Sequence, residues 1–136
     1  IPVIYTDASY EGVGVRFRQQ LNENSKMLCW HNAIPEMNHN ELVGWAGGNE
    51  QLAVIIFRNE TDFYRSQKRM DINKGIIRKY TTNITEVFSK GLSAIERTLY
   101  LIHFGDYISV ELADLKQIDA TEVDVITGLK DELSKI

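Results

Sequence analysis

The chain has a single cysteine and no long apolar run, and both absences limit what it can be. Cys29 cannot form an internal disulfide within these 136 residues, which favours a reducing, cytoplasmic setting and a small buried hydrophobe at this position. No apolar segment reaches the roughly 20 residues that a membrane-spanning helix requires. We therefore expect no membrane partner.

Basic residues are also fewer than acidic residues. Fifteen Lys and Arg residues face 19 Asp and Glu residues, which gives a formal net charge of −4. Nucleic-acid-binding domains usually carry a basic face, so we expect no nucleic-acid partner. The basic residues between Arg58 and Arg69 are interrupted by Glu60 and Asp62, which favours a solvated helix face over a binding patch.

The sequence also lacks the spacings that hold metals or dinucleotides. No arrangement of His, Cys and carboxylates is typical of a metal site, and Gly12-Val13-Gly14 is too short for a dinucleotide fingerprint. The sequence therefore predicts no metal and no cofactor. His31 lies in a strand-like run and His103 in a long apolar run, so we expect structural roles for both, with His103 in the core.

The order of the apolar runs predicts the fold. The length fits a single domain over residues 1–136. Strands are predicted at 1–5, 27–34, 52–57 and 84–88, and helices at 10–22, 38–45, 61–80, 92–115 and 121–133. Alternation of this kind predicts an α/β fold, a three-layer αβα sandwich on a parallel sheet, with C-terminal helices added. The helix at 92–115 is apolar on several faces, so we expect it to be central.

Two polar clusters stand at the ends of predicted elements. Glu23 follows the helix at 10–22, and His39 begins the helix after the second strand. Carboxylate and imidazole groups are common in proton transfer, although each residue could equally be a solvated helix-end residue. Asn22, Asn38 and Asn40 beside them could bind a hydroxyl-rich substrate, or could form caps and turns.

The predicted second strand separates these two clusters. At about 3.3 Å per residue, an extended segment 27–34 holds Glu23 and His39 roughly 25 Å apart. One chain would not bring both groups into one pocket, whereas a symmetric dimer could place Glu23 of one subunit beside His39 of the other. We therefore expect a homodimer. The strand-like start at Ile1, without an initiator Met, further suggests a domain of a longer polypeptide.

With these motifs the sequence resembles the C-terminal part of the bifunctional phosphoglucose/phosphomannose isomerases, in the sugar isomerase (SIS) superfamily. The resemblance rests on Leu21-Asn22-Glu23-Asn24-Ser25-Lys26 and Pro35-Glu36-Met37-Asn38-His39-Asn40-Glu41, with support from segments 101–107 and 129–133. It implies the second of two flavodoxin-like SIS subdomains, paired with an N-terminal SIS subdomain of the same polypeptide. It also implies metal-free interconversion of glucose 6-phosphate and fructose 6-phosphate, with mannose 6-phosphate as a further substrate.

The resemblance assigns roles to particular residues. Glu23 matches the base that moves a proton between C1 and C2 through an enediol, and His39 matches the group that assists ring opening across the dimer. Lys130 matches a lysine near the ring oxygen, although it could equally be a cation favoured at a helix C-terminus. Thr121 matches a hydroxyl linked to mannose 6-phosphate, but its spacing to Lys130 differs from the family pattern.

One part of the family pattern is missing. We find no Ser- and Thr-rich phosphate loop, and Ser9, near a helix start, is the one candidate anion contact. The alternative to an enzyme is a non-catalytic phosphosugar-binding or dimerisation module of the same superfamily. A module of that kind has no need of Glu23, His39 and Lys130 together.

Overall fold

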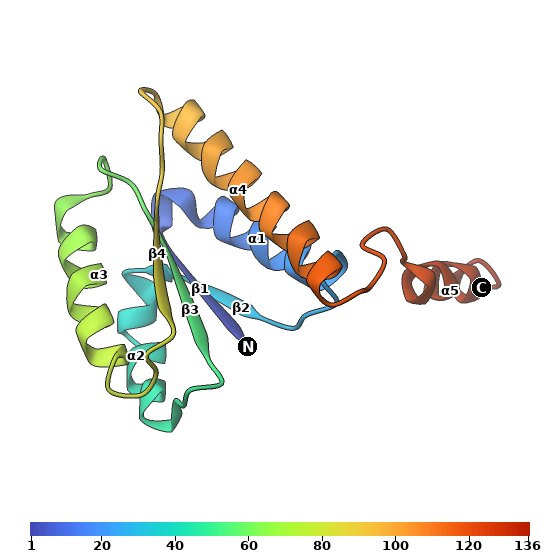
Figure 1. Ribbon diagram of the computed structural model, residues 1–136, viewed down its shortest axis with the longest axis horizontal. Coiled ribbons are helices and arrows are strands. Elements are labelled where there is room, and N and C mark those ends of the chain that lie inside the picture. The colour runs from blue at the N-terminus through green and yellow to red at the C-terminus, as the bar shows by residue number, and fades with distance from the viewer.

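A parallel sheet of four strands forms the centre of the structure (Figure 1). This computed structural model describes residues 1–136, with β1 (Pro2–Asp7), β2 (Trp30–Ile34), β3 (Ala53–Arg58) and β4 (Ile84–Phe88). The strand order is β2-β1-β3-β4, and every neighbouring pair is parallel. Every residue of β1 is buried, as expected of a strand in the middle of a sheet that is covered on both faces. The predicted α/β fold is thus confirmed.

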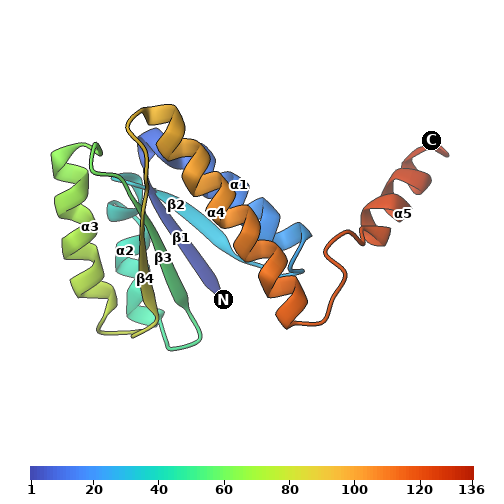
Figure 2. The same cartoon turned by 45° about the horizontal axis from the view of Figure 1, so that its top comes forward.

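Helices cover both faces of this sheet (Figures 1 and 2). The helices are α1 (Glu11–Glu23), α2 (Glu41–Gly44), α3 (Tyr64–Ile77), α4 (Ala94–Leu115) and α5 (Asp124–Leu133), with 3-10 turns at Ala8–Tyr10, Glu36–Asn38 and Trp45–Gly47. The two views place α1 and α4 on one face and α2 and α3 on the other. No helix of the chain is both long and apolar enough to cross a membrane.

Alternation along the strands gives each face its own core. Val3 and Tyr5 of β1 join the core beneath α2 and α3, which also contains Met37, Trp45 and Met70. Ile4, between them, joins the core beneath α1 and α4. The other members of that second core are Tyr10, Val13, Phe17, Leu21, Phe57, Val87 and Leu101. The four-residue spacing Val13, Phe17, Leu21 is the stripe that predicted α1.

The long helix α4 lies at the surface, so the prediction of a central helix is wrong. One face packs on α1 through buried Leu101, Gly105 and Ala113. The opposite face leaves Ile95, Leu99, Tyr107 and Val110 exposed. Apolar residues on several faces predicted burial on several sides, but within this chain only α1 and the sheet cover the helix.

His103 is likewise exposed and does not belong to the core. It is on the outer part of α4, where its ring meets the edge of the Tyr107 ring at a centroid distance of 4.7 Å. The helical repeat explains the error, because Leu101 and Gly105 face α1 and residue 103, between them, faces outward.

Four local predictions also need correction. β2 begins at Trp30 instead of Met27, and the helix predicted at 38–45 is divided into two 3-10 turns and the short α2. Arg58 is not on a solvated helix face: it ends β3, is buried, and pairs with Asp71 at 3.0 Å and Glu86 at 2.6 Å. Cys29 is half-buried, and its burial raises the pKa of the thiol.

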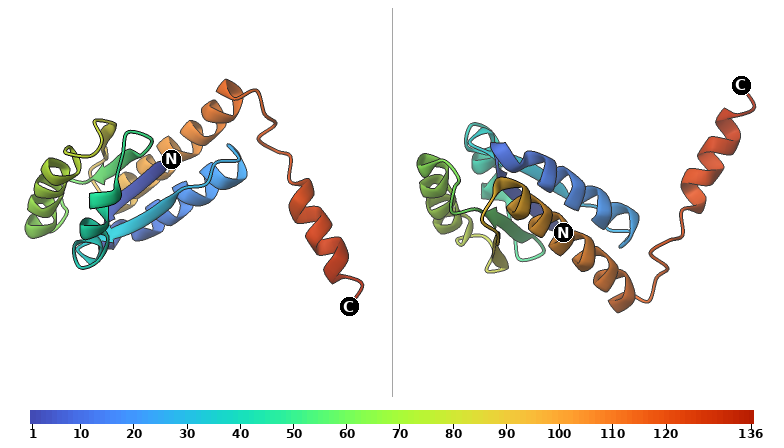
Figure 3. Two further views of the ribbon diagram at one scale, coloured as in Figure 1. Left: turned by 90° about the horizontal axis from the view of Figure 1, so that it is seen from below. Right: turned by 90° about the horizontal axis from the view of Figure 1, so that it is seen from above.

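Helix α5 stands apart from the rest of the molecule in every view (Figures 1, 2 and 3). All its residues are exposed, including the apolar stripe Val125, Ile126, Leu129 and Leu133. It begins at Asp124, three residues later than predicted. Its position in this chain is therefore determined by the linker that joins it to α4.

Gly105 permits the close packing of α4 on α1, and we expect Gly105→Ala to be destabilising. An added Cβ would lie 2.9 Å from Cδ2 of Phe17, which is buried and cannot move aside. Overpacking of this kind costs about 1–3 kcal/mol. Gly75→Ala, in the exposed last turn of α3 with no atom within 4 Å of the new Cβ, should instead stabilise by up to about 1 kcal/mol. Urea unfolding of both variants measures the difference, and equal free energies of unfolding would contradict this account of the packing.

Candidate functional site

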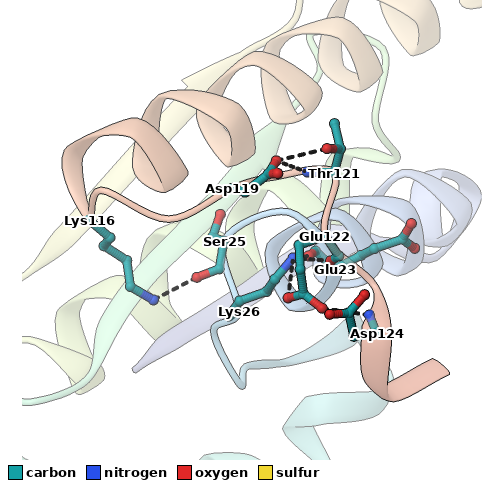
Figure 4. A network of polar contacts seen from close by, with 8 residues as sticks. All are labelled: Glu23, Ser25, Lys26, Lys116, Asp119, Thr121, Glu122 and Asp124. Atoms are coloured by element: carbon teal, nitrogen blue, oxygen red, sulfur yellow. Dashed lines mark hydrogen bonds and ion pairs between the residues drawn. The ribbon is translucent and has the colours of Figure 1, made fainter. Parts of the chain in front are cut away.

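The last turn of α1 carries Glu23 beside a network of polar contacts that joins α1 to the segment before α5 (Figure 4). Glu23 is exposed, and Figure 4 shows its carboxylate directed away from the Lys26 ammonium group. Lys26 Nζ instead donates to the backbone oxygen of Glu23 at 2.7 Å and to that of Glu122 at 2.6 Å. The carboxylate makes no hydrogen bond within the chain, so it is open to a contact from outside the chain.

A cavity of about 310 Å³ lies between the end of α1 and the start of α5. Asn22, Glu23 and Lys26 line one wall, and the other wall consists of Glu122, Val123, Val125 and Ile126. This volume is at the lower end of the range for small-molecule sites, about 300–1,000 Å³. The cavity therefore combines a free carboxylate, a cation and a small apolar surface.

His39 lies at the other end of β2. It follows the 3-10 turn after the carboxyl end of that strand, and it is exposed. Glu23 precedes β2, and Figure 1 shows α1 and β2 running in opposite directions. The structure therefore does not bring His39 and Glu23 of one chain together, in agreement with the separation expected from the sequence.

The asparagines of the two motifs make hydrogen bonds within the chain. Asn22 Nδ2 donates to the Met27 carbonyl at 2.7 Å, and Asn38 Nδ2 donates to Asn73 Oδ1 at 2.7 Å. Asn40 caps α2, because its Oδ1 accepts from the Glu41 N–H at 2.6 Å. Of the three, only Asn22 lines the cavity beside Glu23, where its Oδ1 has no partner in the chain.

Thr121 and Lys130 belong to the linker and to α5. The Thr121 hydroxyl donates to Asp119 Oδ1 at 2.7 Å, which closes a tight turn in the linker. The hydrogen bonds from Thr121 lower the pKa of Asp119. Lys130 is exposed on α5, and its side chain makes no hydrogen bond. Thr121 therefore directly precedes Glu122, which lines the cavity. The position of Lys130 depends only on where α5 lies.

Glu41, two residues after His39, was not singled out by the sequence analysis. Its carboxylate accepts from the Tyr5 hydroxyl, from Trp30 Nε1 at 3.0 Å and from Asn32 Nδ2 at 2.8 Å. Burial, and then Glu41, raise the pKa of Tyr5, so this hydroxyl keeps its proton and remains a donor. Glu41 thereby fixes α2, and the loop carrying His39, to β1 and β2. A cavity of about 350 Å³ adjoins it.

In the turn after β1, the polar groups of the chain form hydrogen bonds with one another. Asp7 Oδ1 accepts from the N–H of Ser9 at 2.9 Å and from its hydroxyl at 2.6 Å. These bonds, together with one from Ser66, outweigh burial and lower the pKa of Asp7. Ser9 is therefore not available as an anion contact, which corrects the expectation from the sequence.

The strand order and the two helical layers define an α/β sandwich built on a parallel sheet. The structure resembles that of a glucose-6-phosphate isomerase-like protein from Thermus thermophilus, with a TM-score of 0.69 and 19% sequence identity. The match covers 90% of this chain and 42% of that chain. At this identity the likeness establishes the fold alone.

Sequence comparison then identifies the family. The model of the bacterial phospho-glucose isomerase C-terminal SIS domain matches residues 1–133, and the chain belongs to this family. Relatives named bifunctional phosphoglucose/phosphomannose isomerase occur in Aquifex aeolicus, 34% identical over 99% of this chain, and in Caldicellulosiruptor bescii, 35% identical over 100%. The chain spans 43% and 41% of the lengths of these two relatives.

Proposed function

We propose that this chain is the catalytic C-terminal part of an isomerase that interconverts aldose and ketose hexose 6-phosphates. The substrates are glucose 6-phosphate and fructose 6-phosphate, with mannose 6-phosphate as a further aldose. One observation carries the proposal: the unpaired carboxylate of Glu23 lines a small cavity at the end of α1 in a domain whose family is named for phosphoglucose isomerase.

In this proposal Glu23 is the base. Its carboxylate removes the proton from C2 of the open-chain aldose while the C1 carbonyl oxygen takes up a proton from solvent and becomes an enediol hydroxyl. The same group returns the proton to C1 as the C2 hydroxyl releases its own proton to solvent and becomes a carbonyl, which completes the ketose. A positioned carboxylate suits both steps, because it accepts and then donates one proton without a cofactor.

The other residues act on the ring and on the hydroxyls. His39 of the second subunit moves the proton that opens the sugar ring, since imidazole exchanges protons near neutral pH. Lys130 provides a positive charge near the ring oxygen, where negative charge develops as the ring opens. Asn22 Oδ1 accepts a hydrogen bond from a substrate hydroxyl in the cavity. Asn38 and Asn40, beside His39 of the second subunit, and Thr121 bind further substrate hydroxyls.

The proposal requires two partners. A homodimer brings His39 of one subunit to Glu23 of the other, since the two residues flank opposite ends of β2 in one chain. An N-terminal SIS subdomain of the same polypeptide supplies the phosphate site. The relatives are more than twice as long as this chain, which leaves room for a second subdomain of similar size.

We expect the isolated chain to have little or no isomerase activity. Phosphate binding energy positions the reacting carbons, and the turn after β1 in this chain is occupied by Asp7. A coupled assay for fructose 6-phosphate turnover, on this chain and on the intact protein with its upstream subdomain, measures the difference. Robust turnover by the isolated chain would contradict the proposed division of labour.

Measurements on the intact protein also distinguish an enzyme from a non-catalytic binding module. If the intact protein binds hexose 6-phosphates in calorimetry but leaves C2 of the sugar unexchanged, the domain is a non-catalytic phosphosugar-binding module. If it turns the sugar over, the catalytic proposal stands.

A further inference from the structure

Lys26 has a backbone conformation that a lysine rarely adopts. Its φ is 49°, in the left-handed region, where glycine fits without steric cost. It follows Ser25, which is fully buried, and lies three residues after the end of α1. Local strain of this kind persists only where the surrounding structure holds it in place, and it concentrates at functional sites. The side chain of Lys26 is therefore the feature to explain.

The Lys26 ammonium group joins two parts of the chain that are far apart in sequence (Figure 4). It donates to the Glu23 carbonyl at 2.7 Å and to the Glu122 carbonyl at 2.6 Å, and it lies 4.0 Å from Glu122 Oε2. The Glu23 carbonyl is among the last four of α1, which have no partner inside the helix. A cation there also faces the negative end of the helix dipole.

A second lysine ties the same loop to α4. Lys116 Nζ donates to the Ser25 carbonyl at 2.6 Å, and the Ser25 hydroxyl donates to the Ser109 carbonyl at 2.6 Å. Lys116 thus anchors the beginning of the linker between α4 and α5, residues 116–123. Lys26 anchors the far end of this linker, next to α5. Every residue of α5 is exposed. The hydrogen bond from Lys26 to Glu122 is therefore the last one that ties the chain to the domain before α5 begins.

We infer that Lys26 is a positioning residue that holds the cavity in its catalytic shape. Through one ammonium group it fixes the backbone of Glu23 on one wall and that of Glu122 on the other. It thereby determines where α5, with Lys130, leaves the domain relative to the Glu23 carboxylate. This inference rests on the proposed isomerase function. No substrate contact by Lys26 is part of it.

The chain provides a matched pair of variants for the test. Lys26→Gly keeps the left-handed backbone, relieves its strain and removes the ammonium contacts. Gln117→Gly relieves the same kind of strain, since Gln117 has a φ of 56° and its side chain makes no hydrogen bond. Lys26→Arg keeps a cation of similar reach. A general effect of glycine in the loops would appear in both glycine variants.

Two readouts are taken on the intact protein. We expect Lys26→Gly to raise amide hydrogen exchange in the linker 116–123 and to lower kcat for fructose 6-phosphate, each by about tenfold, since hydrogen bonds to charged groups are among the stronger polar contacts. KM should change by less than about twofold, because the loss is in the placement of the base. Gln117→Gly should leave both readouts unchanged, and Lys26→Arg should restore most of each.

Each other outcome has a definite meaning. Unchanged exchange and unchanged kcat in Lys26→Gly would overturn the inference. A lower kcat with unchanged exchange would also overturn it, because Lys26 would then act on the substrate directly. Faster exchange with unchanged kcat would overturn it as well, because the tether would then have no part in catalysis. If the intact protein with native Lys26 isomerises no hexose phosphate, the proposed function fails, and the exchange measurement alone decides whether the tether exists.

Discussion

Glu23→Gln should lower kcat of the intact protein by about 10²–10⁴-fold, the usual contribution of a positioned general base. Glutamine keeps the shape of the side chain and its hydrogen bonding, but it cannot accept the C2 proton. KM should stay within about twofold, because the lost interaction belongs to the transition state and not to substrate binding. Initial rates over a range of fructose 6-phosphate concentrations measure both constants.

The control for this variant is a carboxylate without a proposed role. Glu111 is exposed on α4, and its side chain makes no hydrogen bond or ion pair, so Glu111→Gln should leave kcat and KM unchanged. A rise in KM for Glu23→Gln with kcat intact would contradict the account, because it would assign Glu23 to sugar binding.

Mixing two inactive variants should restore activity if His39 acts across the dimer. His39→Ala subunits retain Glu23, and Glu23→Gln subunits retain His39, so a mixed dimer contains one complete site. Random exchange of subunits should give about a quarter of the native activity, because half the dimers are mixed and each has one working site of two. The measurement is turnover of glucose 6-phosphate, a mainly cyclic substrate, after the variants are dissociated and reassociated together.

The double variant is the control for complementation. Glu23→Gln/His39→Ala subunits complete no site with either single variant, so those mixtures should stay inactive. His39→Ala should also be less impaired with an open-chain substrate analogue, because ring opening is then unnecessary. Failure of the two single variants to complement each other would place both residues in one subunit's site, or remove His39 from the chemistry.

Apolar patterning predicted the sheet and α1 because both are covered within this chain. The run Ile1–Tyr5 predicted β1 (Pro2–Asp7), which is buried along its whole length, and the stripe Val13, Phe17, Leu21 packs beneath α4. The same reasoning failed for α4 and for His103. Their apolar neighbours are on an outer face that nothing in this chain covers, and periodicity cannot tell a face that is buried here from one that is not.

The candidate site was only partly predictable. The opposite placement of Glu23 and His39 follows from the strand between them, which is a local feature of the sequence. The tether from Lys26 to Glu122 spans 96 residues, so no local pattern indicates it. The environment of Glu41 has a weak signal in sequence, because Tyr5 places a hydroxyl inside an apolar run, and a buried hydroxyl requires a hydrogen-bond partner.

The most direct test of Glu23 as the base is deuterium incorporation at C2 of glucose 6-phosphate in D₂O, followed by NMR alongside turnover. The native intact protein should exchange this hydrogen with solvent, because the proton passes through the enediol and the base before it returns to carbon. Glu23→Gln should abolish the exchange while it still binds the sugar phosphate in calorimetry. Exchange by Glu23→Gln at the native rate would contradict the account, because the base would then be another residue.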